Sequence, residues 1–329
     1  MEVVSGIHQL RVPIPDNPLG HLNCYLIEGK DGWLMVDTGW YTRDAFDSLI
    51  EELKGLGLVM ADISTMIVTH VHPDHFGLAG RIKHMSPRTE LITHRWESDL
   101  IEPRYIKLSE LRDKMSKLLS RHGVPPSNLS TLESASMPAL QYVTVTLPDR
   151  TVYGGEIIDT GRFNLEVIWT PGHSPGHICL YEPRNQILLS GDHILPTISP
   201  NISYHVQSGD NPLGDYTNAL RKLIHLSVSK VLPAHENIFT EFSGRIEEIL
   251  DHHEKRKAEM QMVLSESPSN AYDISARITW DIPTLTWEQF PPLHQRAAVT
   301  ETVAHLECLR WEGKVRREMK DQVITYAAA

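Results

Sequence analysis

The chain has 329 residues, a formal net charge of -11 at pH 7 and a hydrophobic fraction of 41%. This composition is typical of a soluble globular protein with a substantial core, and its acidity argues against a general nucleic-acid-binding surface. Three widely spaced cysteines make a disulfide framework unexpected. The N-terminal residues lack the pattern of a secretory signal, and no stretch is long and apolar enough for a bilayer, so we expect a cytoplasmic protein that does not enter a membrane.

The N-terminal part of the chain alternates between strand and helix signals. Strands are expected at residues 7–12, 23–28, 33–37 and 90–93. Asp31 and Gly32 are typical of a hairpin turn between two of them. Apolar residues recur at helical spacing over residues 43–56 and, more briefly, over residues 76–85. This alternation indicates an α/β protein in which helices cover a sheet.

Four residues with metal-binding side chains follow an apolar run in the segment THVHPDHFGLAG. His70 and His72 lie two residues apart, so on an extended backbone both imidazoles face the same side. Pro73 helps to turn the chain, so that Asp74 and His75 can approach from another direction. Imidazole nitrogen and carboxylate oxygen suit zinc and its borderline neighbours. A single histidine at a strand end is usually a polar surface residue, but four such side chains in six positions indicate that one segment serves two adjacent metals.

The pattern formed by these four residues resembles the signature of the metallo-β-lactamase superfamily of metal-dependent hydrolases. Three further ligand motifs that this family requires follow in the expected order: TPGHSPGH with His173, LLSGD with Asp192 and VLPAHE with His235. The aspartate that the family places beside the ligands is supplied nearer the N-terminus by MVDTG, as Asp37. The resemblance runs from about residue 7 to residue 240.

The resemblance implies an αββα sandwich with a binuclear metal site. It assigns the two ions to His70, His72 and His173 on one side and to Asp74, His75 and His235 on the other, with Asp192 bridging them. Asp74 and Asp192 would also orient the attacking hydroxide, and Asp37 would lie beside the ligands. Zinc is the expected metal, although manganese and iron are tolerated by such ligand sets. From the residues alone, Asp37 is equally well a helix cap and Asp192 a turn former.

Residues 96–149 interrupt the strand and helix alternation with a helical stretch. Leu108, Leu111 and Met115 recur at helical spacing before a pair of prolines. In family members such an insertion often forms a cap over the metal cleft, so the resemblance implies a helical cap here. Leucines and methionines at this spacing are also typical of helices that pack against the main body, so no binding residue is assigned to it.

Strand signals return after the insertion, at residues 156–159, 165–169, 177–181 and 187–190. Residues 193–209 contain too many prolines and small polar residues for regular structure, so we expect a loop beside the metal cleft. Tyr204 and His205 are candidates for contacting substrate or a developing oxyanion, with simple anchoring of the loop as the competing explanation. His177 is expected to pack or to orient a ligand. Lactonases of the family place a tyrosine soon after the bridging aspartate, and Leu195 at this point argues against a lactonase.

The resemblance ends near residue 240, so we expect a catalytic domain of residues 1–240. A connecting helix follows at residues 241–267. His252 and His253 are adjacent in it and therefore point to different sides, which argues against a chelating pair. We expect both histidines on a solvated face.

Residues 268–329 look like a separate module. Helices are expected at residues 273–278 and 296–312, and a hairpin at residues 314–327. This order resembles the winged-helix appendage of a family branch that includes endoribonucleases. A DNA-reading helix should carry several exposed basic residues, yet the second helix has two arginines, Arg296 and Arg310, against three glutamates. The helix is therefore predicted to serve packing or protein contact.

Two classes of function are consistent with the sequence. The first is a di-metal hydrolase of ester, thioester or lactone bonds, similar to glyoxalase II, which acts on a small-molecule acyl substrate. The second is a phosphodiesterase or endoribonuclease with the same metals. The acidity of the chain and the weakly basic C-terminal helix favour the acyl substrate over nucleic acid. The presence of all seven ligands argues against a degenerate, non-enzymatic site. The sequence leaves open whether the protein forms a homo-oligomer.

Overall fold

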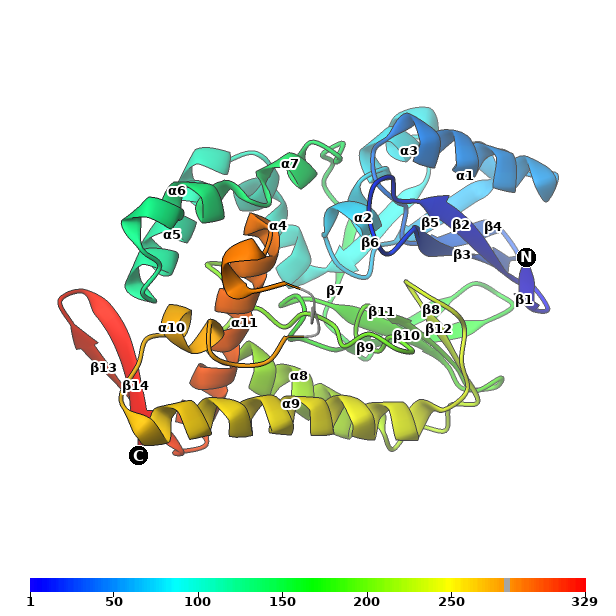
Figure 1. Ribbon diagram of the computed structural model, residues 1–329. Coiled ribbons are helices and arrows are strands. Elements are labelled where there is room, and N and C mark those ends of the chain that lie inside the picture. The colour runs from blue at the N-terminus through cyan, green and yellow to red at the C-terminus, as the bar shows by residue number, and fades with distance from the viewer. Residues whose placement is uncertain (281–284) are drawn as a thin grey trace.

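The computed structural model describes residues 1–280 and 285–329. Two β-sheets pack face to face at the centre of the molecule (Figure 1). The first sheet is formed in sequence order by β1 (Glu2–Val4), β2 (Ile7–Pro13), β3 (His21–Gly29), β4 (Gly32–Val36), β5 (Ile63–Ile67), β6 (Glu90–His94) and β7 (Arg150–Val152). The second sheet has the order β12 (Lys230–Pro233), β11 (Ile187–Gly191), β10 (Ile178–Glu182), β9 (Asn164–Trp169) and β8 (Ile157–Asp159).

Helices cover the outer face of each sheet. On the first sheet these are α1 (Arg43–Gly55), α2 (Pro73–Phe76), α3 (Ala79–Met85) and α4 (Arg95–Tyr105), together with the short helix η1 (Met60–Asp62). On the second sheet they are α8 (Pro212–Leu223) and the long α9 (Phe242–Glu266). This αββα arrangement agrees with the fold predicted from the sequence, and Figure 1 shows its four layers.

The central layer is apolar because alternate side chains of both sheets point into it. Val36 and Ile67 of the first sheet pack there with Leu165, Val167 and Leu180 of the second, and all five are almost fully buried. Removing such a buried aliphatic side chain typically costs about 2–5 kcal/mol. The central layer therefore holds the two sheets in a defined relation, which in turn fixes the loops at their edges.

Strand direction brings the ends of several strands to one edge. β5 runs parallel to its neighbours β4 and β6. In the second sheet, β12 is parallel to β11, while β10 is antiparallel to both β9 and β11, so that β9, β11 and β12 all run the same way. The C-terminal ends of β5, β9, β11 and β12 each lead directly into a predicted ligand motif.

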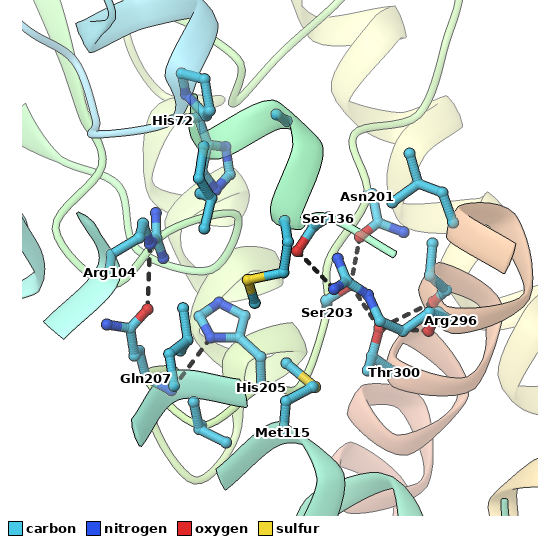
Figure 2. A pocket seen from close by; sticks show the side chains of 18 of the residues that line it. His72, Arg104, Met115, Ser136, Asn201, Ser203, His205, Gln207, Arg296 and Thr300 are labelled. Carbon is cyan, nitrogen blue, oxygen red and sulfur yellow. Dashed lines mark hydrogen bonds between the residues drawn. The ribbon is translucent and has the colours of Figure 1, made fainter. Parts of the chain in front are cut away.

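The insertion and the C-terminal residues lie together at one end of the sandwich (Figure 1). The insertion contains α5 (Leu108–Arg121), α6 (Pro126–Ser134) and α7 (Met137–Leu140). The C-terminal residues form α10 (Ala271–Ser275), η2 (Trp287–Gln289), α11 (Pro292–Trp311) and the hairpin of β13 (Val315–Lys320) and β14 (Val323–Ala328). Leu119 and Leu132 of the insertion share a small core with Val299 of α11. The two regions enclose a cavity between them (Figure 2).

Two local expectations were wrong in part. The helix expected at residues 76–85 is instead divided between α2, which ends at Phe76, and α3, which begins at Ala79. Between them, a Cβ on Gly77 would lie 2.4 Å from the carbonyl oxygen of Tyr142, so this position requires glycine. His253 is buried rather than solvated, because α11 packs on α9 and places Nε2 of His305 3.0 Å from Nδ1 of His253. In the part of the chain that the structure describes, no helix combines the length and apolar character needed to cross a membrane.

Candidate metal centre

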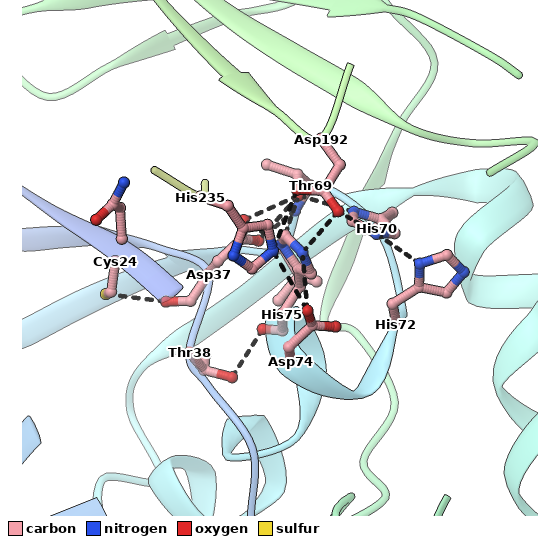
Figure 3. A network of polar contacts seen from close by, with 12 residues as sticks. Cys24, Asp37, Thr38, Thr69, His70, His72, Asp74, His75, Asp192 and His235 are labelled. Atoms are coloured by element: carbon pink, nitrogen blue, oxygen red, sulfur yellow. Dashed lines mark hydrogen bonds and ion pairs between the residues drawn. The ribbon is translucent and has the colours of Figure 1, made fainter. Parts of the chain in front are cut away.

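The segment after β5 carries the first four predicted ligands to the edge of the sandwich (Figure 3). His70 and His72 lie in the short irregular stretch between the strand and α2, which begins at Pro73. Proline at the first position of a helix is favoured because its missing N–H would have no partner there. Asp74 and His75 therefore lie in the first turn of a helix and point from a different direction, as the sequence predicted.

The other three predicted ligands follow strands of the second sheet. His173 lies in the turn after β9, Asp192 directly follows β11, and His235 follows β12. Gly172 makes the first of these turns possible, because it has a positive φ of 134° and a Cβ there would lie 2.3 Å from Cβ of Tyr216. Ligands from two sheets thus meet at one point of the molecule.

The seven side chains form overlapping groups. Within each group the candidate ligand atoms lie within 4.8 Å of one another: His70, His72 and His173 in the first, His70, His75 and Asp192 in the second, and Asp74, His75 and His235 in the third. The carboxylate of Asp192 lies 3.5 Å from Nε2 of His173 and 3.4 Å from Nε2 of His235. Asp192 therefore stands between the two outer groups, where a bridging ligand would have to be.

Several ligand atoms of the cluster are buried without a hydrogen-bond partner. These atoms are Nε2 of His75, Oδ1 of Asp192 and Nε2 of His235. Unpaired buried polar atoms are rare in proteins because they lose their hydration without compensation. All three point into the space between the groups, and nitrogen and oxygen donors of this kind suit divalent zinc, manganese or iron. The residues present thus fit a binuclear metal site.

The charge of the cluster changes from one side to the other. Burial lowers the pKa of His70 and of His72 well below the usual range, with neighbouring histidines adding to the effect, so both rings are neutral and can donate a lone pair. Burial also opposes the charged form of His75, but the carboxylates of Asp192, Asp37 and Asp74 outweigh it and hold its pKa well above the usual range. The carboxylate-rich side therefore favours a nearby positive charge, which a divalent ion would supply.

Partners behind the ligands fix their orientation. Nδ1 of His75 donates to Oδ2 of Asp37 at 2.8 Å, and the backbone N–H of Thr69 donates to Oδ1 of the same carboxylate at 2.8 Å. Nδ1 of His173 lies 3.0 Å from the carbonyl oxygen of Asn201, and Nδ1 of His235 lies 3.2 Å from that of His21. Each contact leaves Nε2 directed into the cluster, which is the arrangement found around metal-bound histidines.

His177 and Glu97 stabilise the cluster from a greater distance. Nε2 of His177 accepts from the backbone N–H of Asp192 at 3.1 Å. The buried carboxylate of Glu97 accepts from the backbone N–H groups of Val71 and Gly176, both at 2.8 Å, and so ties the loop between His70 and His72 to the turn that carries His173. Sequence reasoning missed Glu97, because an acidic residue in the first turn of a helix is ordinarily explained by the helix dipole.

The two substrate candidates predicted in the 193–209 loop lie in different surroundings. His205 lines the cavity of about 300 Å³ that opens beside His72 and His173 (Figure 2). Tyr204 is not among the lining residues; its backbone N–H donates to the carbonyl of Thr300 at 2.9 Å, and its ring packs between the second-sheet core and the C-terminal core. The loop itself has no regular structure, as predicted.

Comparison with known proteins identifies the family. Residues 18–235 match the family described as the metallo-beta-lactamase superfamily. This match covers more than half of the chain, so the protein belongs to the metallo-β-lactamase superfamily and is a metallo-hydrolase. The family and the fold predicted from the sequence are thereby confirmed.

Individual relatives extend the similarity to both ends of the chain. The probable metallo-hydrolase YqjP of Bacillus subtilis is 28% identical over 319 residues, which are 92% of this chain and 94% of that protein. The crystal structure of the metallo-beta-lactamase family protein TTHA1429 from Thermus thermophilus has a TM-score of 0.84 and 29% identity, and the match covers 100% of both chains. The human acyl-coenzyme A thioesterase MBLAC2 is 27% identical over 234 residues, which are 66% of this chain and 74% of that protein.

Proposed function

We propose that this protein hydrolyses the thioester bond of a small acyl substrate at a binuclear metal centre. The observation that carries this proposal is the cavity beside His72 and His173, whose wall includes an apolar part suited to an acyl chain, formed among others by Leu111, Met115, Met137, Leu140 and Leu293. The similarity to acyl-coenzyme A thioesterases supports the same bond type.

The roles of the ligands are part of the proposal. His70, His72 and His173 would hold one ion and Asp74, His75 and His235 the other, with Asp192 between them. Zinc suits these nitrogen and oxygen donors, as do manganese and iron. When bound, two such ions lower the pKa of water and polarise a carbonyl group.

The side chains of the protein orient the reactants. Asp74 and Asp192 face the space between the ligand groups, where they can accept hydrogen bonds from the attacking water and direct its lone pair. Leu111, Met115 and Leu140 line the adjoining cavity and would hold the acyl chain away from water. Water adds to the carbonyl carbon, the carbon–sulfur bond breaks, and a carboxylate, a thiol and a proton are released.

The C-terminal residues would then form part of the wall of the same cavity. We propose that residues 268–329, apart from the undescribed positions 281–284, form a winged-helix-like module appended to a catalytic unit of residues 1–240. Much of α11 is buried against α9, α10 and the insertion. A recognition helix must be free to enter a nucleic-acid groove, so this packing favours an acyl substrate over nucleic acid.

The test is a comparison of two substrates. Metal-loaded wild-type protein and Asp192→Asn would be assayed on hexanoyl-coenzyme A and on a single-stranded RNA oligomer. We expect thioester hydrolysis by the wild type, nearly complete loss in the variant, and no RNA cleavage by either. RNA cleavage without thioester hydrolysis would overturn the proposal in favour of the phosphodiesterase alternative.

A further inference from the structure

The cavity beside the metal centre contains two arginines and, among the described residues that line it, no aspartate or glutamate. Arg104 comes from α4, and Arg296 comes from α11 (Figure 2). The chain as a whole carries a net charge of -11, so this concentration of positive charge is a local feature. It calls for a specific explanation, because Arg104 is buried and charged groups are rarely buried without a partner of opposite charge.

Arg104 is only 7% exposed. Its Nε donates to Oε1 of Gln207 at 3.1 Å, and one terminal nitrogen lies 3.5 Å from the carbonyl oxygen of Val71. No described residue that lines the cavity with it carries a carboxylate. A guanidinium has five N–H donors, so both its charge and several donors remain available to a ligand.

Arg296 has still fewer partners within the described structure. One terminal nitrogen donates to Oγ of Ser136 in the insertion at 2.6 Å, which is a neutral contact. Burial lowers the pKa of its guanidinium to about 10, so the group stays charged at neutral pH. Arg296 is partly exposed and lines the cavity, so its charge and its remaining N–H donors can reach a ligand there.

His205 lies in the same cavity and does not offset these charges. Burial lowers its pKa to about 3, and the positive charges of Arg104 and Arg296 contribute to this shift. His205 is therefore neutral at physiological pH, and it lines the same cavity as both arginines. Apolar side chains occupy much of the remaining wall, among them Leu111, Met115, Met137, Leu140 and Leu293.

We propose that this cavity binds an anionic group of the substrate, a carboxylate or a phosphate, with Arg104 and Arg296 as its counter-ions and the apolar wall around the attached chain. The substrate would thus be an amphipathic anion whose reactive carbonyl lies at the metal centre. Only the statement that this anion belongs to the hydrolysed substrate rests on the proposed function. Arg296 also gives the C-terminal module a role, because the module supplies one of the two charges from α11.

Binding measurements test this without requiring turnover. Isothermal titration calorimetry on the metal-loaded full chain would compare adipate with hexanoate, which has the same length but one carboxylate fewer. A second pair, 4′-phosphopantetheine and pantetheine, would place the negative charge on the thiol side of the substrate instead. We expect the wild type to prefer the more anionic member of at least one pair, and the preferred pair identifies where the charge is carried.

Variants of Arg296 form the second part of the experiment. Arg296→Met should weaken binding of the preferred anion by about 10- to 100-fold, because it removes charge-assisted hydrogen bonds, and should change binding of the less anionic ligand by less than about threefold. Arg296→Lys should restore part of the affinity. Arg43→Met removes one positive charge from an exposed site on α1 and should change neither ligand. Unfolding midpoints would show that the variants are folded.

The outcomes separate this inference from the proposed function. Equal affinities within both ligand pairs, or a preference that survives Arg296→Met in folded protein, would overturn the inference. A preference that depends on Arg296 in a protein that hydrolyses no thioester would preserve the anion site and overturn the thioesterase proposal.

Discussion

Asp37 and His75 are joined by a hydrogen bond of 2.8 Å that links the end of the first sheet to the ligand-bearing helix. Asp37 has a positive φ of 60°, a conformation that aspartate tolerates better than most residues. This conformation turns its carboxylate toward Nδ1 of His75, so that Nε2 of the same ring faces the opposite direction, 3.4 Å from Asp192. The backbone conformation at the end of β4 thus fixes the orientation of a candidate metal ligand.

Asp37→Asn should therefore weaken metal binding. An amide nitrogen can donate to His75, which would favour the wrong tautomer and place a hydrogen on Nε2. Loss of such an outer partner typically lowers metal affinity by about 10- to 100-fold. Competition of the purified protein with a calibrated chelator would measure this. Asp31→Asn, on an exposed turn, is the matched control and should bind metal as the wild type does.

Asp192→Asn should reduce thioester turnover more strongly than Asp37→Asn, because Asp192 lies between both ligand groups rather than behind one of them. The backbone N–H of residue 192 would still donate to His177, so the fold around it should persist. Turnover, metal content and the unfolding midpoint would be measured on the same preparation. Wild-type turnover in a well-folded variant would refute the assignment of this carboxylate to the site.

Glu97→Gln should destabilise the protein. The carboxylate accepts from two backbone N–H groups and from Oγ of Ser174 at 2.5 Å, whereas an amide has only one oxygen to accept with. Hydrogen bonds to a charged group contribute about 1.5–3 kcal/mol each, so the free energy of unfolding should fall by about 2–3 kcal/mol. Urea unfolding would measure the change. Glu102→Gln, an exposed position on the same helix, should stay within about 0.5 kcal/mol of the wild type.

Acid should weaken the contact between α9 and α11. Burial lowers the pKa of His305 to about 3 and that of His253 well below its usual value, so both are neutral when folded and protonate readily only when unfolded. The unfolded state therefore binds more protons below about pH 6.5, and the free energy of unfolding falls as pH decreases from there toward the folded pKa values.

His305→Gln tests this directly. Removing one such histidine should reduce the dependence of the unfolding free energy on pH by up to about 1.4 kcal/mol per pH unit between pH 6 and pH 4, relative to the wild type. Urea titrations at several pH values would give the two slopes. His225→Gln, on an exposed segment, should leave the slope unchanged. Identical slopes for His305→Gln and the wild type would contradict the prediction.

Local sequence determined much of the αββα sandwich. Strand and helix periodicity predicted most elements of the sandwich, because each one buries an apolar face whose spacing is visible in the chain. The ligand motifs are equally local: four candidate ligands fall within six residues, and Asp74 and His75 owe their direction to the helix that begins at Pro73. Such features need only a few neighbouring residues, so they could be predicted without the fold.

Tertiary structure alone decided how distant segments meet. Arg104 and Arg296 look like ordinary surface residues of two helices, and only the packing of α11 against the insertion brings both into one cavity. His253 appeared solvated for the same reason, because its burial depends on α11 rather than on its own helix. Helical periodicity shows that a face is apolar but not which partner covers it. The candidate metal centre could therefore be predicted from the sequence, whereas the cavity that would select its substrate could not.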